Sequence, residues 1–249
     1  MKIFICQIIF IFTFFCGIIN AEQNKKLADI DYFRQANEYY KTANYQQALD
    51  SYYKIKNKNS AVYFNIGNCY FKLNQKGRAL YFYRLAKSIN PLNSKINENI
   101  RMVRTARQDK FLTKKNTLSA LIENFINSYS LRFAFILFSL FLWLTCIFTV
   151  LRIFYKKRIF TILIIVNLLI LFGAFIFLSF KLFEPDEAIL IENNVSLKAE
   201  PLENAAELAK LNDATEVKII NYLKNWVEVI VAETHKGYLP KTSLFILKK

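Results

Sequence analysis

Apolar residues recur at helical spacing from Asp31 to Arg107, and this stretch contains two similar units. Small and aromatic residues of the first unit return 31 residues later in the second. The matching positions are Ala36, Tyr39, Tyr45, Ala48 and Tyr52 in the first unit and Gly67, Tyr70, Lys76, Ala79 and Tyr83 in the second. Self-similarity at this period predicts stacked helix pairs. Small residues where two helices cross let the backbones approach, while neighbouring aromatics fill the space around the crossing.

We place the two units at about residues 30–59 and 60–93, within an all-α helical-repeat domain that spans 22–110. Pro91 ends the second unit, since proline cannot continue a helix. An amphipathic helix at 94–107 is expected to cover the open end of the stack as a cap. Two units and a cap are near the minimum for such a stack, so another part of the chain or a partner is expected to help stabilise it.

Two almost uncharged runs, 131–151 and 159–180, are long enough to cross a hydrocarbon core about 30 Å thick. The segment between them, 152–158, carries a cluster of cations: Arg152, Lys156, Lys157 and Arg158. Short loops with such a cluster stay in the cytoplasm, so the pattern predicts a transmembrane helical hairpin with both flanking domains outside. Asn167, a polar amide inside the second run, is expected to bond to the neighbouring helix rather than to line a transport path.

Residues 1–21 have the layout of a secretory signal peptide, with Lys2, a long apolar stretch and then Ala21 before polar sequence. We predict cleavage after Ala21. Ile19 is large where a cleavage site prefers a small residue, so a retained anchor is the alternative. Either alternative places the helical-repeat domain outside the cytoplasm.

Residues 117–130 carry apolar side chains on one helical face and predict an amphipathic juxtamembrane helix. Such a helix either packs against the repeats or lies in the lipid interface, and the sequence does not separate the two.

After Pro185 the pattern changes to short runs rich in β-branched residues, separated by polar turns that contain Asn, Asp or Gly. The runs are 188–191, 195–198, 216–220, 226–231 and 237–240. Strands this short and this closely spaced predict a small all-β barrel over residues 186–249.

The formal net charge of +15 belongs to the N-terminal half of the chain. Residues 22–130 carry 19 Lys and Arg against 8 Asp and Glu, whereas residues 181–249 carry 9 against 11. A basic surface beside a bilayer is explained at least as well by anionic lipid headgroups as by nucleic acid. We therefore expect the lipid bilayer, and no nucleic acid, among the partners.

The residues that carry chemistry in enzymes are missing from the sequence. His235 is the single histidine, and Cys69 is the single cysteine outside the apolar runs, so neither zinc ligation nor a disulfide framework is expected. We find no nucleophile beside a base, no paired carboxylates and no phosphate-binding glycine loop. The expectation is a protein that is not an enzyme and that holds no metal or cofactor.

The candidate site is instead a groove on the first helices of the repeats. It is formed by Phe33, Asn37, Tyr40, Lys41, Phe64, Asn68, Phe71 and Lys72, with Lys95 on the cap helix. An aromatic groove with amides and ammoniums suits an extended peptide, whose backbone the amides would hold and whose carboxylates the lysines would hold. The alternative is that the aromatics cover the core and the lysines are ordinary surface residues.

Residues 60–91 resemble the tetratricopeptide repeat. The consensus places are occupied by Tyr63, Ile66, Gly67, Tyr70, Ala79, Tyr83, Ala86 and Pro91. The C-terminal segment resembles a bacterial SH3-type domain, in which the strand with Trp226 and the strand with Gly237 and Tyr238 are implied to pack across a barrel. One departure is the pair Asn212–Asp213, where that family has a turn glycine, although both residues tolerate the same backbone.

The order of signal peptide, repeats, hairpin and SH3-like domain resembles the BatE type of aerotolerance operon protein, known from Bacteroidetes. The resemblance implies a bacterial inner-membrane protein, two-pass after signal cleavage, with periplasmic N- and C-terminal domains. It also implies neighbours of the von Willebrand A type and a complex linked to envelope or oxidative stress. The leading hypothesis is a scaffold that binds protein partners. The alternative is a cell-wall-binding or sensing protein that recognises peptidoglycan through its SH3-like domain.

Overall fold

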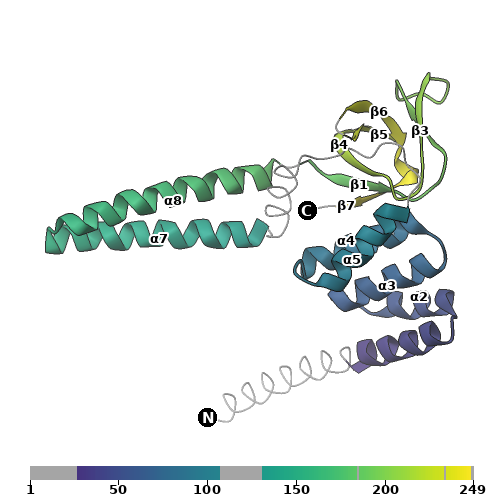
Figure 1. The fold of residues 1–249 in the computed structure, drawn as a ribbon, viewed down its shortest axis with the longest axis horizontal. Coiled ribbons are helices and arrows are strands. Elements are labelled where there is room, and N and C mark those ends of the chain that lie inside the picture. Colours follow the sequence, from purple (N-terminus) through teal and green to yellow (C-terminus); the bar gives the residue numbers. More distant parts are fainter. Residues whose placement is uncertain (1–26, 107–130, 184, 233, 248–249) are drawn as a thin grey trace, which may run out of the picture.

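The computed structural model describes residues 27–106 and 131–247, except 184 and 233. The predicted signal peptide at 1–21 and the predicted amphipathic helix at 117–130 lie outside the described residues. Figure 1 shows the described part as a group of short helices, a long helical pair and a sheet, with the short helices beside one edge of the sheet.

The short helices begin with residues 27–41 and follow one another through tight turns. They continue as α2 (Tyr45–Lys54), α3 (Ser60–Lys72), α4 (Lys76–Ile89) and α5 (Ser94–Ala106). Ala43 and Asn74, which are equivalent positions of the two units, both adopt a left-handed backbone, with φ of 60° and 59°. Each helix from α2 onward packs on the next, as the prediction of stacked helix pairs requires.

Small residues lie at the helix crossings, where the sequence pattern places them. Ala36, Ala48 and Ala79 are fully buried. A Cβ on Gly67 would lie 2.6 Å from the ring of Tyr83, so α3 approaches α4 too closely for a larger residue. The close approach explains why the small residue Gly67 on α3 faces the large ring of Tyr83 on α4.

The long pair consists of α7 (Leu131–Tyr155) and α8 (Arg158–Leu182). Within them, Phe133–Tyr155 and Arg158–Ser179 are long and apolar enough to cross a membrane, with mean hydropathy of 2.5 and 2.9. Only Lys156 and Lys157 lie between the two helices, so the predicted loop at 152–158 is shorter than expected and both helices extend into it.

Asn167 is 4% exposed within this pair. Its Nδ2 donates to the Phe141 carbonyl oxygen at 2.9 Å and to Thr145 Oγ1 at 2.6 Å, both on α7. The predicted bond to the neighbouring helix is therefore confirmed.

The C-terminal part is an antiparallel sheet of seven strands. They are β1 (Glu187–Leu190), β2 (Val195–Lys198), β3 (Glu207–Leu211), β4 (Glu216–Tyr222), β5 (Trp226–Val231), β6 (His235–Pro240) and β7 (Leu244–Leu247). The five predicted strands are present as β1, β2, β4, β5 and β6. The sequence pattern missed β3 and β7.

The predicted closed barrel is wrong. The strand order is β3-β2-β6-β5-β4-β1-β7, and within the described residues the end strands β3 and β7 do not pair with each other. β2 meets β6 at one residue pair, Lys198 with Tyr238, and its register with β3 shifts after Leu197. Helix α4 lies against β7 instead, where the rings of Tyr81 and Phe245 pack edge to face at 4.9 Å. Helix α4 thus covers the β7 edge of the sheet. In a closed barrel this edge would not exist.

Candidate partner-binding groove and the domain contact behind it

The predicted groove residues lie on three consecutive first helices: residues 27–41, α3 and α5. The 31-residue repeat makes Asn37, Asn68 and Asn99 equivalent positions, one on each of these helices. On a helix, residues four apart share a face, so Phe64, Asn68 and Lys72 follow one side of α3. Lys95 and Asn99 have the same spacing on α5.

The asparagines form a ladder of hydrogen bonds between helices. Asn37 Oδ1 accepts from the Tyr52 hydroxyl at 2.6 Å and from Asn65 Nδ2 at 3.3 Å. Asn68 Oδ1 accepts from the Tyr83 hydroxyl at 2.8 Å and from Asn99 Nδ2 at 3.0 Å. The ladder therefore connects the three first helices and fixes both buried tyrosines.

The ladder leaves hydrogen-bond donors for a ligand. Within the described residues, the Nδ2 groups of Asn37 and Asn68 donate to no protein acceptor, although both amide oxygens are occupied. An amide nitrogen in this position suits the carbonyl oxygen of an extended backbone. Asn99 was missed by the sequence analysis, although it lies 31 residues after Asn68 and could have been found from the repeat.

The aromatic members of the groove are half-buried. Phe33 packs on Tyr52 with centroids 6.0 Å apart, and Phe64 packs on Tyr83 at 5.7 Å. Tyr40 packs on Tyr45, and it also lies with Phe71 against the core of the repeats. These rings therefore cover the core of the repeats, as one of the two alternatives expects, while each keeps part of its surface exposed.

Burial keeps the tyrosine hydroxyls of the ladder protonated. It raises the pKa of Tyr52 and of Tyr83, mainly because the charged phenolate would lose its water. Both hydroxyls therefore remain donors to the asparagine oxygens across the physiological range. Burial likewise raises the pKa of the Cys69 thiol to about 12, so this cysteine is an inert core residue.

The lysines of the groove differ in their surroundings. Lys41 donates to Glu38 Oε1 at 2.8 Å, whereas Lys72 and Lys95 are exposed and pair with no carboxylate among the described residues. Lys72 at the end of α3 and Lys95 at the start of α5 can therefore each pair with an acidic group of a ligand.

Behind the groove, the sheet docks onto α4 through the start of that helix. Gly77 N donates to Asp213 Oδ1 at 2.7 Å. The helix supplies no side-chain cap of its own and has no acidic residue in its first turn. Asp213, on the turn before β4, thus caps a helix of the other domain and satisfies an amide that lacks an intrahelical partner.

The capping carboxylate is partly desolvated. Burial raises the pKa of Asp213, and this outweighs the hydrogen bonds from the backbone amides of Gly77, Ala214 and Lys76, which lower it. Gly77 itself fits tightly, because a Cβ there would lie well under 3.0 Å from the Leu190 carbonyl oxygen.

An ion-pair cluster holds the rest of the contact. Arg84 pairs with Glu187 and donates to Glu216 Oε1 at 2.8 Å. Arg104 on α5 donates from Nε to Glu216 Oε2 at 2.7 Å. Ile189 and Ala214 from the sheet complete the core of the helical repeats. The sequence pattern predicts that another part of the chain or a partner helps stabilise the repeats, but it does not identify the residues of this contact.

Comparison of the chain with models of known protein families and with curated proteins finds no match. The groove and the domain contact are therefore interpreted from their own residues.

The SH3-type positions lie in the middle of the sheet. Trp226 pairs with Pro240, and Glu228 pairs with Tyr238, across β5 and β6. A Cβ on Gly237 would lie 2.7 Å from Leu197 Cγ and 2.8 Å from the Lys198 carbonyl oxygen, so glycine permits the approach of β2 to β6.

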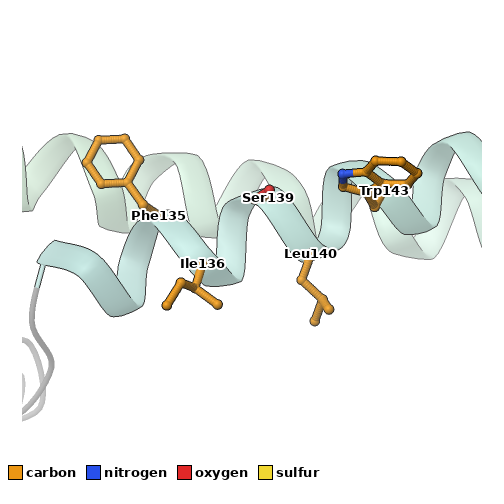
Figure 2. A pocket seen from close by; sticks show the side chains of 5 residues that line it. All are labelled: Phe135, Ile136, Ser139, Leu140 and Trp143. Atoms are coloured by element: carbon orange, nitrogen blue, oxygen red, sulfur yellow. The ribbon is translucent and has the colours of Figure 1, made fainter. Parts of the chain in front are cut away.

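A shallow hollow on α7 offers no site for chemistry. Figure 2 shows that its five lining side chains all come from this one helix: Phe135, Ile136, Ser139, Leu140 and Trp143. An open apolar helix face of this kind suits contact with lipid tails. Among the described residues, no three His, Cys, Asp or Glu side chains lie close enough to hold a metal ion.

Proposed function

We propose that the protein is a membrane-anchored scaffold whose helical repeats, of the tetratricopeptide type, bind an extended segment of a partner protein. One observation carries this proposal. Among the described residues, the amide nitrogens of Asn37 and Asn68 donate to no acceptor, and the ammoniums of Lys72 and Lys95 pair with no carboxylate. Amide donors in a row along a groove match the spaced carbonyl oxygens of an extended peptide.

The two lysines define the preferred partner chemistry. Ammoniums without a carboxylate partner favour a segment with acidic side chains or a C-terminal carboxylate, since an opposite charge gives both attraction and orientation. The half-buried rings of Phe64 and Phe71 add apolar contact area beside them. An acidic segment with interspersed apolar residues is the expected ligand.

The docked sheet leaves the groove open. The sheet contacts α4, a second helix. On the first helices it bonds to Arg104 of α5, which is not a groove residue. In stacked helix pairs the first and second helices form opposite layers, so sheet and ligand would occupy different faces.

The candidate membrane anchor supports the cellular setting that we propose. The hairpin of α7 and α8 with its basic turn at Lys156 and Lys157 favours a cytoplasmic turn. The repeats precede the hairpin, the sheet follows it, and the two are docked to each other, which requires both on the same side. We place them in the periplasm, in a complex of the Bat type with von Willebrand A-type membrane proteins.

The test is an affinity purification of the full chain from gently solubilised membranes. The variant K72E/K95E reverses the two unpaired charges and leaves the ladder intact, so it is expected to fold and to lose the co-purified partners. K56E makes one such charge reversal at an exposed loop position outside the groove and is expected to keep them.

Retention of the same partners by K72E/K95E would refute the groove. A cell-wall function predicts a different pattern, in which purified peptidoglycan captures the wild type and K72E/K95E equally. That result would move the binding site from the repeats to the sheet.

A further inference from the structure

The β4–β5 hairpin lies at the end of the sheet that is nearest the C-terminal end of α8. Residues 183–186 connect α8 directly to β1, which begins at Glu187. β4 runs antiparallel to β1, so its last residue, Tyr222, lies at the α8 end of the sheet. The Tyr222 hydroxyl donates to Asp186 Oδ2 at 2.6 Å, which fixes this arrangement.

The connection is short enough to hold the hairpin beside a bilayer. Residues 183–186 reach about 14 Å when fully extended. The candidate span ends at Ser179, and the rest of α8 adds about 4.5 Å. A headgroup layer is roughly 5–8 Å thick on each side. Even at full extension the connection exceeds the headgroup layer by only about 10–14 Å, which keeps the hairpin close to the membrane surface.

The residues at this tip are those that suit a lipid headgroup layer. Tyr222 is 45% exposed, and Trp226 is partly exposed. Lys224 is exposed in the turn, and exposed Lys241 is held beside it by a backbone bond from Lys241 N to the Asn225 carbonyl oxygen at 2.9 Å. Aromatic rings with a polar edge concentrate at membrane interfaces, and lysines are attracted to anionic headgroups.

Two carboxylates described at this end, those of Asp186 and Glu187, are engaged within the protein. Asp186 accepts from Tyr222, and Glu187 pairs with Arg84. A cation thus offsets the charge of Glu187, whereas Asp186 receives its hydrogen bond from a neutral hydroxyl.

The helical repeats add apolar residues to the same end. The start of α4 packs on Leu190 and its Arg84 on Glu187, so α4 runs antiparallel to β1 and ends toward α8. Past Arg84, Ile89 is 52% exposed, and Leu92 in the following turn is 84% exposed. Exposed side chains of this kind are costly in water and favourable in the headgroup and acyl boundary.

We propose that this membrane-facing end, formed by Ile89, Leu92, Tyr222, Lys224 and Trp226, inserts into the headgroup layer of an anionic lipid bilayer. The inference rests on the proposed membrane anchoring by α7 and α8. It adds that the docked domains lie on the bilayer rather than projecting from it, which fixes the height of the groove above the surface.

The two tryptophans of the chain allow a direct test. In full-length W143F, reconstituted in vesicles of phosphatidylcholine and phosphatidylglycerol, Trp226 is the single tryptophan. Lipids brominated close to the ester groups are expected to quench Trp226 strongly, and lipids brominated near the chain end weakly. In W226F, Trp143 in the middle of α7 is expected to show the opposite order.

Variants distinguish insertion of the membrane-facing end from membrane anchoring by α7 and α8. Adding L92S and K224E to W143F is expected to abolish the quenching of Trp226, whereas K72E, near the opposite end of the helical domain, is expected to leave it unchanged. Failure of the lipid bromines to quench Trp143 would refute the membrane anchoring. Quenching of Trp143 together with an unquenched Trp226 that remains accessible to aqueous iodide would overturn the present inference alone.

Discussion

Substitution of Gly77 by alanine tests the docking of the two domains. Gly77 lies in the first turn of α4, and no glycine among the described residues has a positive φ, so its own backbone does not require glycine. Alanine in a helix is favoured over glycine by about 0.5–1 kcal/mol. In an undocked helix, G77A would therefore stabilise the protein.

In the docked structure, G77A is instead expected to be destabilising. A Cβ at position 77 would lie well under 3.0 Å from the Leu190 carbonyl oxygen and from Asp213 Oδ1. Loss of the bond from Gly77 N to the carboxylate costs about 1.5–3 kcal/mol. Overpacking costs about 1–3 kcal/mol more, against the helix gain above. The net effect is about 2–5 kcal/mol against docking, which lowers the ratio of docked to undocked protein roughly 30- to 5000-fold.

Hydrogen exchange at position 77 measures this ratio. The amide has no intrahelical acceptor, so its protection depends on Asp213 across the contact. In full-length protein in nanodiscs, G77A is expected to exchange at least 30-fold faster at this amide, roughly the lower limit worked out above. G173A is the control, since no atom lies within 4 Å of its added methyl group. An unchanged or slower exchange in G77A would refute the docking.

Three further predictions follow from single contacts. Y83F removes the donor to Asn68 Oδ1 and is expected to lower the stability of the repeats by about 1 kcal/mol in urea unfolding; an unchanged midpoint would contradict the ladder. R84Q removes the cation that pairs with Glu187 and an arginine contact of Glu216, and is expected to weaken docking by about 1–3 kcal/mol, seen as faster exchange at position 77. The pKa of Asp213 is raised in the folded state, so the folded protein binds more protons than the unfolded chain, and stability falls as pH rises from 3.8 through the folded pKa. D213N is expected to abolish this dependence of stability on pH. Parallel curves of stability against pH for wild type and D213N would contradict the prediction.

The local elements followed from the sequence, because each has a period that burial imposes. The five predicted strands alternate buried and exposed residues or form a buried run, as β5 does with every second residue buried. β3 was missed because it is an edge strand with Leu211 as its single buried residue. β7 was missed because four apolar residues near the end of the chain carry no periodicity.

The open sheet and the domain contact did not follow from the sequence, because they depend on segments far apart in the chain. Closure was expected from the strand count, but α4 covers the β7 edge through Tyr81 and Phe245. Asp213 had been noted only as a departure from a turn glycine. Its role appears when the unsatisfied amide of Gly77 lies beside it.

The contact between the sheet and the helical repeats explains how so short a stack of repeats is stable. Two helix pairs and a cap bury little core, and consecutive repeats normally stabilise one another through their interfaces. Here Ile189 and Ala214 enter the helical core, and Asp213 caps α4, so the sheet takes the place of the next repeat on the second-helix face. The first-helix face, with the asparagine ladder, needs no such cover. Because the sheet stabilises the repeats through the second-helix face, the first-helix face can remain open for a partner.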